Sequence, residues 1–291
     1  MRILEPAPNS HKKLPHRSKR RFALYGFILI CVSLTFFFFM HKMKARQNVD
    51  AQNNHSNQDI SDPVAQSNAT SQDTVKDTLR NFTDNEFRLF YDNVRQAGVK
   101  PLENPPVISG NDIADTRIRS IAELRGYKLR NTPTTSLVPI DGQKLQADAA
   151  TAWEKMKQEA SNENLAINLV SGYRSVDDQR QLFLQRLSAT GVSIEDVAEG
   201  LADAQINKVL TTTSIPGYSK HHTGYTLDLF CAGFAFEKFK DSTCHTWLSN
   251  DNYKNAKLFG FIPSYPSDAD GQGPDPEAWE YVYVGTELLY E

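Results

Sequence analysis

The sequence has few cysteines, no internal repeat and almost no excess of charge of either sign. Its 291 residues include three cysteines, and 32 basic against 35 acidic side chains leave a formal net charge of −3. A charge this balanced gives no reason to expect a nucleic-acid partner. The length suits one domain of ordinary size with extensions and is sufficient to bury a full hydrophobic core.

Such charge asymmetry as exists is found at the N-terminus, where residues 1–21 contain many basic side chains and the single acid Glu5. The apolar run 22–40 follows without any charge, and as a helix it would be about 28 Å long, close to the hydrocarbon thickness of a bilayer. Basic residues before the run predict a cytoplasmic N-terminus. We therefore expect residues 22–40 to be an uncleaved transmembrane signal anchor. A cleaved signal peptide is the alternative, although no small-x-small pattern follows Met40.

Both interpretations export everything after about residue 46, and the cysteines fit this placement. Cys31 lies inside the apolar run, whereas Cys231 and Cys244 lie in the exported part. Oxidising compartments permit a disulfide between the two exported cysteines, which we expect to form. Two buried free thiols are the alternative.

Composition divides the remaining chain into three segments. Residues 41–74 are rich in Asn, Gln, Ser and Asp and cannot bury enough apolar surface to offset their ordering entropy, so they are expected to form a disordered linker. Residues 75–118 are interpreted as a helical N-terminal extension, because apolar side chains recur there at roughly helical spacing. Residues 119–291 are expected to form the main domain.

Within the main domain, hydrophobic periodicity predicts helices and short strands without regular βαβ alternation. Helices are expected over 145–159, 176–187, 193–210 and 247–258, and strands over 165–170 and 279–284. This mixture favours an α+β fold.

The stretch 216–228 contains the densest set of reactive side chains in the sequence. It resembles a loop leading into a strand, with His221 and Asp228 seven residues apart. Imidazole nitrogen and carboxylate oxygen are both good zinc ligands, but a catalytic zinc site usually takes a third ligand from the protein and keeps one position for water. The position of that third ligand decides the functional interpretation.

Four motifs occur in order along the chain: Ser171-Gly-Tyr-Arg-Ser175 with Gln179, Gly217-Tyr-Ser-x-His-x-x-Gly224 with Asp228, Phe259-Gly-Phe-x-x-Ser-Tyr-Pro266, and Glu277-x-Trp279 before Tyr-Val-Gly285. With them the sequence resembles the VanY-like D-alanyl-D-alanine carboxypeptidases, a family that includes LD-carboxypeptidases and is related to the VanX dipeptidases. The resemblance covers about residues 120–286. It implies a zinc peptidase fold of the VanY-like/Hedgehog type, a small antiparallel sheet flanked by helices, acting on peptidoglycan stem peptides.

The resemblance also implies roles for individual residues. His221 and Asp228 correspond to zinc ligands, Glu277 to the general base, and Arg174 to an arginine that stabilises negative charge during the reaction. The substrate site is expected to include four further residues: Ser219, Gln179, Tyr173 and Trp279. His222 is expected to be an ordinary neighbour of the ligand, and Arg174 outside this motif would be read as the partner of a structural carboxylate.

The sequence departs from the family pattern at the third ligand, where a histidine normally follows the tryptophan. Here Glu280 follows Trp279, and no histidine occurs after His245. In one interpretation Glu280 ligates zinc through oxygen, giving a weaker Lewis acid with a preference shifted toward other divalent metals. In the other, metal is bound poorly or lost, and the domain binds peptidoglycan without catalysis. Retention of Glu277 favours catalysis, because a binding protein does not need the base.

The sequence therefore predicts a single-pass protein of a bacterial cytoplasmic membrane with its C-terminal domain in the periplasm or extracytoplasmic space. Its expected activity is metal-dependent removal of a terminal D-amino acid from peptidoglycan stem peptides. A non-catalytic peptidoglycan-binding protein is the main alternative, and an endopeptidase acting on cross-bridges is a weaker one.

Overall fold

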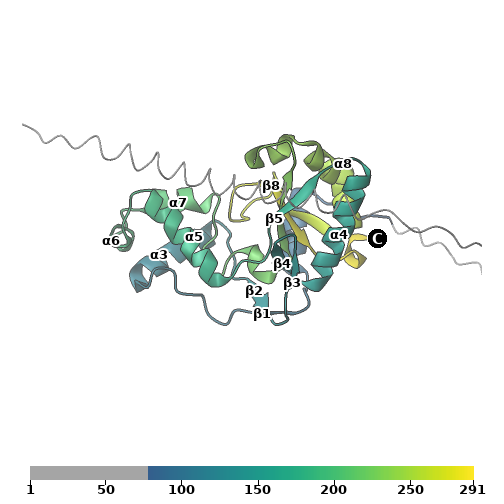
Figure 1. Cartoon of the computed structure of the whole chain (residues 1–291). Helices are drawn as coiled ribbons and strands as arrows, with labels where there is room; N and C mark the ends of the chain where they lie inside the picture. Colours follow the sequence, from purple (N-terminus) through teal and green to yellow (C-terminus); the bar gives the residue numbers. More distant parts are fainter. Residues whose placement is uncertain (1–77) are drawn as a thin grey trace, which may run out of the picture. The chain divides into compact units, whose positions relative to one another are not determined.

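The computed structural model describes residues 78–291, which lie within one compact unit of the chain (Figure 1). The signal anchor expected at 22–40 and the linker expected at 41–74 lie outside these residues. Among the described helices, none combines the length and the apolar character needed to cross a membrane.

An antiparallel sheet of four strands lies at the centre of the unit. Its order is β5 (Ile167–Ser171), β6 (Thr226–Cys231), β8 (Glu277–Tyr283) and β7 (Phe261–Tyr265). Two smaller antiparallel pairs lie next to it in Figure 1: β1 (Val99–Pro101) with β2 (Asn131–Pro133), and β3 (Val138–Ile140) with β4 (Gln143–Leu145). Helices combined with small antiparallel sheets confirm the α+β class expected from the sequence.

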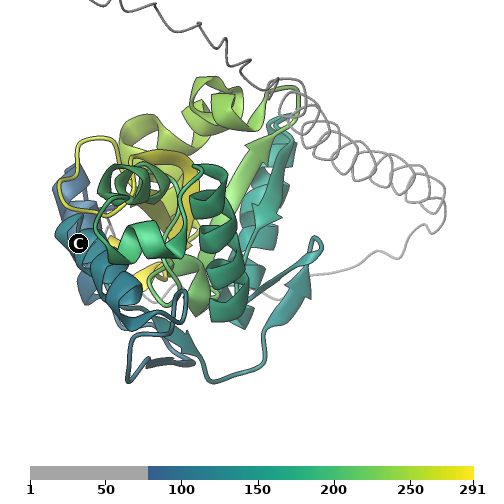
Figure 2. The same ribbon diagram turned by 90° about the vertical axis from the view of Figure 1, so that its left-hand side faces the viewer.

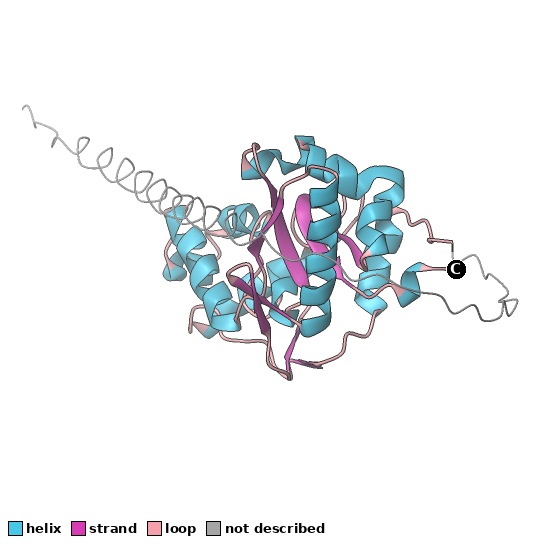
Figure 3. Cartoon of the chain, turned by 45° about the vertical axis from the view of Figure 1, so that its right-hand side comes forward, coloured by secondary structure: helices cyan, strands magenta, loops and turns pink. Residues whose placement is uncertain are grey.

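Three helices pack with the four-stranded sheet to form the larger hydrophobic core (Figure 3): α2 (Asp84–Asn93), α4 (Ala147–Asn162) and α8 (Thr243–Leu258). In α4 the buried residues recur every three or four positions, which is the spacing of one helix face: Ala149, Trp153, Met156 and Ala160. The amphipathic pattern of the sequence therefore directs α4 onto the sheet.

A second hydrophobic cluster is formed by helices and the loops between them, without strand residues, and its helices are on the left in Figure 1. Its helices are α3 (Asp112–Leu124), α5 (Val176–Ala189), α6 (Ile194–Ala198) and α7 (Asp203–Leu210). Three short 3₁₀-helices complete the described elements: η1 (Lys220–Thr223), η2 (Phe236–Asp241) and η3 (Glu287–Leu289). The motif-bearing segments 171–175 and 216–224 connect the helical cluster to the sheet.

Two helices expected from the sequence are interrupted. The helix expected over 193–210 is two helices, α6 and α7, because the chain turns at Gly200, whose φ is +80°. The helix expected over 247–258 forms the end of α8, but its residues 250–253 are not helical. Asn252 adopts a left-handed conformation there, and its side-chain amide pairs with both the backbone N–H and the carbonyl of Phe82.

The N-terminal extension is packed into the larger core. Phe87 and Tyr91 of α2 are buried in it, and Phe87 contacts Tyr253 edge to face. The first described segment lies beside the C-terminus of the chain (Figure 2). The Arg80 N–H donates there to the carbonyl of Leu289. The domain boundary expected at residue 118 falls inside α3.

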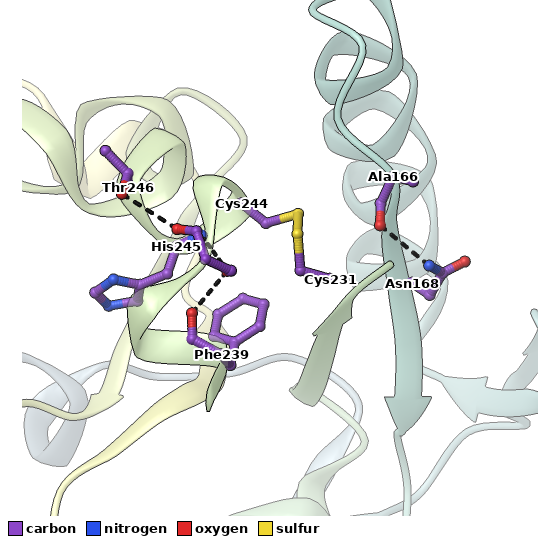
Figure 4. The surroundings of a disulfide bond; sticks show 8 residues. Ala166, Asn168, Cys231, Phe239, Cys244, His245 and Thr246 are labelled. Carbon is purple, nitrogen blue, oxygen red and sulfur yellow. Dashed lines mark hydrogen bonds between the residues drawn. A yellow bond between two sulfur atoms is a disulfide. The ribbon is translucent and has the colours of Figure 1, made fainter. Parts of the chain in front are cut away.

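A disulfide joins Cys231, the last residue of β6, to Cys244 in the first turn of α8 (Figure 4), which confirms the expected pairing. The hydroxyl of Ser242 caps α8 by accepting a hydrogen bond from the backbone N–H of His245. The disulfide thus fixes the start of α8 to the strand that carries Asp228.

We expect removal of this disulfide to lower the stability of the domain, because it frees a short loop in the unfolded chain. The double variant Cys231→Ser/Cys244→Ser should lose about 3 kcal/mol of unfolding free energy in denaturant titration. Reductant should destabilise the native protein and leave the double variant unchanged. An unfolding midpoint that is the same for both proteins would contradict the prediction.

Candidate metal centre

Pairing of the two central strands brings two carboxylates together. Asp228 of β6 lies directly opposite Glu280 of β8 in the antiparallel register, so their side chains are on the same face of the sheet. Glu280 is buried and Asp228 is partly buried. Like charges in opposite positions destabilise a sheet, so this pair needs a compensating positive charge.

His221 approaches the two carboxylates from η1. The Ser219 hydroxyl caps this short helix by accepting from the N–H of His221, and Gly224 ends it with a φ of +77°. A Cβ at Gly224 would lie 2.9 Å from the Leu137 side chain, so glycine is needed there both for backbone conformation and for space. The turn directs the imidazole toward β6.

The imidazole of His221 is oriented for ligation. Its Nδ1 lies 2.6 Å from the carbonyl oxygen of Gly172, so the hydrogen-bond network assigns the proton to Nδ1. A ligating histidine usually donates its other ring N–H in this way, which fixes the tautomer and raises the basicity of the free nitrogen. The nitrogen that faces the carboxylates is Nε2.

The distances between these three side chains fit ligands of one metal ion. His221 Nε2 lies 3.4 Å from Asp228 Oδ1 and 3.3 Å from Glu280 Oε2, and one ligand atom from each residue can be chosen so that all three lie within 4.8 Å of one another. Two atoms each about 2.0–2.1 Å from a tetrahedral zinc lie about 3.3–3.4 Å apart. In addition, no residue within 78–291 donates a hydrogen bond to the buried Oδ1 of Asp228. The donor set and its geometry therefore fit a divalent cation.

The protonation of His221 reflects the acidity of its surroundings. Burial by itself would lower the pKa of His221, but the negative charges of Asp228 and Glu280 raise it to about 10. A cation bound between these groups would have to displace that proton, so binding would release a proton near neutral pH.

Glu277 begins β8 and lies close to the same charges. In a regular strand Glu277 and Glu280, which are three positions apart, would point to opposite faces of the sheet. The pairing of β7 with β8 is irregular at this segment, because the register shifts between Pro263 and Tyr265. Burial, followed by the charges of Glu280 and Asp228, raises the pKa of Glu277. The strand irregularity therefore places a third carboxylate near the site.

Arg174 is held by neutral partners. Its guanidinium donates to the amide oxygen of Gln179 at 2.9 Å and to the hydroxyl of Ser171 at 3.1 Å. Gln179 is buried and donates in turn to the carbonyl of Ser214. Within the described part of the chain Arg174 forms no ion pair, so its charge is not neutralised by a structural carboxylate.

The other residues expected to contact substrate differ in exposure. Ser219 is buried and serves as the cap of η1. Tyr173 lines a surface hollow next to Lys144, and Trp279 is partly buried, with its ring 5.0 Å from that of Phe236. Contact of Ser219, Gln179, Tyr173 and Trp279 with a substrate remains a prediction.

His222 positions the backbone around the site. Its Nδ1 lies 2.7 Å from the carbonyl oxygen of Arg174, and its Nε2 accepts a hydrogen bond from the N–H of Gly217 at 3.0 Å. These two partners fix a neutral imidazole, and burial lowers the pKa of His222 to about 4. His222 thus joins the two motif segments, a role that its place next to a ligand did not indicate.

Three further residues around Glu280 were given no role in the sequence analysis: Tyr91, Lys220 and Ser264. The Ser264 hydroxyl donates to Glu280 Oε1 at 2.5 Å, and the ammonium of Lys220 donates to the carbonyl of Ser264 at 2.5 Å. The available sequence signals were that Lys220 directly precedes His221 and that Ser264 is one of the residues of the motif 259–266. No sequence signal indicated Tyr91, which comes from α2.

The part of the chain that carries this site is similar to known proteins. The family model described as VanY, D-alanyl-D-alanine carboxypeptidase, matches residues 142–286. Residues 142–286 are therefore similar to the VanY family. It is 24% identical over 230 residues to the Bacillus subtilis (strain 168) protein named carboxypeptidase YodJ, covering 76% of this chain and 78% of that protein.

Two further proteins are similar to part of the chain. The chain is 27% identical over 146 residues to the bifunctional D-Ala-D-Ala dipeptidase and carboxypeptidase VanXYC of Enterococcus gallinarum, covering 48% of this chain and 67% of that protein. A solved structure of VanYB in complex with D-alanine-D-alanine is 22% identical, with a TM-score of 0.42, and covers 53% of this chain and 80% of that one.

We expect His222 to make stability depend on acid pH. Its folded pKa of about 4 lies below the unfolded value of 6.5, so its contribution is complete above pH 6.5 and is lost as the pH falls toward 4. The loss should reach about 3 kcal/mol of unfolding free energy. Denaturant titrations of chelator-treated protein between pH 7 and pH 4 would measure it.

The matched variant for this test is His222→Gln, which keeps polar groups but does not titrate in this range. It should be less stable than the native protein at pH 7 and should lose less stability on acidification. Equal pH slopes for the two proteins would show that His222 does not carry the effect.

Proposed function

We propose that this protein is a metal-dependent carboxypeptidase that removes a terminal D-amino acid from peptidoglycan stem peptides. The observation that carries the proposal is the convergence of His221, Asp228 and Glu280 at ligand distances beside Glu277. The activity named for VanXYC supports the choice of substrate class. The uncharged run 22–40 and the disulfide support membrane anchoring and a location outside the cytoplasm.

The metal would be held by His221, Asp228 and Glu280. A divalent cation at such a site polarises a carbonyl group and lowers the pKa of bound water. Two of the three ligands supply oxygen, and oxygen-rich sets suit harder cations such as Mn²⁺ better than nitrogen-rich sets do. We therefore propose Zn²⁺ as the first candidate and a harder divalent cation as the second.

Glu277 is proposed as the general base. Its burial and the neighbouring carboxylates raise its pKa, so the carboxylate is a stronger proton acceptor than an exposed glutamate. It would take a proton from the attacking water and deliver that proton to the leaving amine, and the peptide bond would break as the amine departs. The two transfers leave Glu277 in its starting protonation state.

Arg174 is proposed to stabilise negative charge on the scissile carbonyl oxygen. A guanidinium that is held in place by neutral hydrogen-bond acceptors keeps its full charge available for the reacting group. Gln179 would act as a positioning residue, because it accepts from Arg174 and is itself held by the carbonyl of Ser214.

The second candidate is a peptidoglycan-binding protein without catalytic activity. Glu280 is the observation that favours it, since a buried carboxylate stands where the family pattern has a histidine. Release of D-alanine from a stem pentapeptide distinguishes catalysis from binding alone.

Replacement of Glu277 should abolish catalysis without loss of metal. Glu277→Gln is expected to release D-alanine from a stem pentapeptide about 10²–10⁴-fold more slowly than the native chain, because proton transfer is lost. Glu199→Gln, at an exposed position, serves as the control and should retain activity. If the metal-loaded native chain releases no more D-alanine than Glu277→Gln, the enzyme proposal fails and binding alone remains.

Glu280→His should restore the ligand set of the family pattern. If Glu280 is a ligand, zinc should bind more tightly to this variant in competition with a chromophoric chelator, because imidazole nitrogen suits zinc better than carboxylate oxygen does. Preference for zinc over manganese should rise in the same titrations. Unchanged affinities for both metals would show that the side chain at position 280 does not contact the metal.

A further inference from the structure

A buried lysine lies directly beside the candidate metal centre. The Lys220 side chain is 2% exposed and immediately precedes His221 in η1. Among the described residues no carboxylate pairs with it, and its nitrogen donates to the backbone carbonyl of Ser264. A buried ammonium without a paired charge is costly, so its retention needs an explanation.

Two aromatic rings enclose this ammonium. The Lys220 nitrogen lies 3.9 Å from the ring centroid of Tyr265 and 4.4 Å from that of Tyr91. Cation–π attraction of this kind contributes most when the cation is desolvated. Both tyrosines are buried, and they come from different elements: β7 and α2. The enclosure therefore holds the amine in one place.

Ser264 links Lys220 to Glu280. Its carbonyl accepts from the lysine, while its hydroxyl donates to Oε1 of Glu280. The other carboxylate oxygen, Oε2, is the one that faces His221 at 3.3 Å. One oxygen of Glu280 is thus fixed by the serine, and the other is left for a ligand.

The formal charge of the ligand set also accounts for a cation at this position. A set of one histidine and two carboxylates carries one negative charge more than the two histidines and one carboxylate of the family pattern. A lysine ammonium beside the carboxylate set offsets that extra charge, so the sum around a divalent cation is equal in the two cases.

We propose that Lys220 is the charge partner of Glu280 and that, acting through Ser264 and enclosed by Tyr91 and Tyr265, it fixes this carboxylate as the third metal ligand. The inference rests on the metal site of the proposed function and deepens it. Lys220 is a positioning residue, since it reaches the metal only through another side chain. Tyr91 makes the N-terminal extension part of the wall of the site.

The test combines two substitutions in the full chain: Lys220→Met and Glu280→His. In the native background Lys220→Met should weaken zinc binding about 10–100-fold, the size of effect typical of groups that orient a ligand. In the Glu280→His background the same substitution should cause no loss, because no extra carboxylate is left to compensate. Chelator competition measures all four affinities.

The matched control is Lys257→Met. Lys257 is also buried, donates to the backbone carbonyl of Arg80 and lies over the ring of Phe82, and neither partner belongs to the candidate metal centre. Its replacement should reduce stability without changing zinc affinity. Equal losses from Lys220→Met in both backgrounds, or no loss in the native one, would overturn the proposal.

A second measurement separates this inference from the proposed function. Unfolding free energies of the chelator-treated proteins should show coupling, with Lys220→Met more destabilising beside the native Glu280 than in the Glu280→Gln background. If the native chain binds no metal but the coupling is present, the function fails and the charge partnership stands. Additive effects of the two substitutions would refute the partnership whether or not metal binds.

Discussion

The pairing of Asp228 with Glu280 across β6 and β8 is the constraint on which the rest of the site depends. Backbone hydrogen bonding fixes these residues opposite one another, so neither carboxylate can move away without disrupting the sheet. Their repulsion within a largely buried region must be offset locally. His221 lies at similar distances from both carboxylates, and its positive charge when protonated offsets their repulsion.

The backbone around this pair is shaped to bring other groups to it. A register shift in β5 precedes Gly172, whose carbonyl orients the His221 imidazole. A second register shift, between β7 and β8, lies at the segment that begins with Glu277, close to the same charges. Such irregularities re-aim side chains at the cost of ladder hydrogen bonds. Both lie in strands that contribute residues to the larger core, and this packing supplies the stability to maintain them.

The sequence indicated the three candidate ligands more clearly than it indicated the residues around them. His221, Asp228 and Glu280 could be identified because motifs fix their spacing and chemistry, and the α+β class followed from helical and strand periodicity. The break at Gly200 was missed although glycine is itself a local turn signal, whereas the left-handed Asn252 was missed because its hydrogen bonds with Phe82 are tertiary and leave no local pattern. Long-range contacts of this kind also placed Tyr91 beside Lys220.

Tyr91 of α2 extends the surroundings of the candidate site beyond the residues that the family model matches. The family model matches residues 142–286, yet a residue about fifty positions earlier encloses the ammonium behind a candidate ligand. Asp92, its neighbour in α2, pairs with Arg130, and the Arg130 guanidinium lies over the same tyrosine ring. Because α2 shares the core of the sheet, its packing and the electrostatics of the metal centre are physically linked. A site that carries an additional carboxylate thus draws on a segment outside the shared motifs to hold the compensating charge.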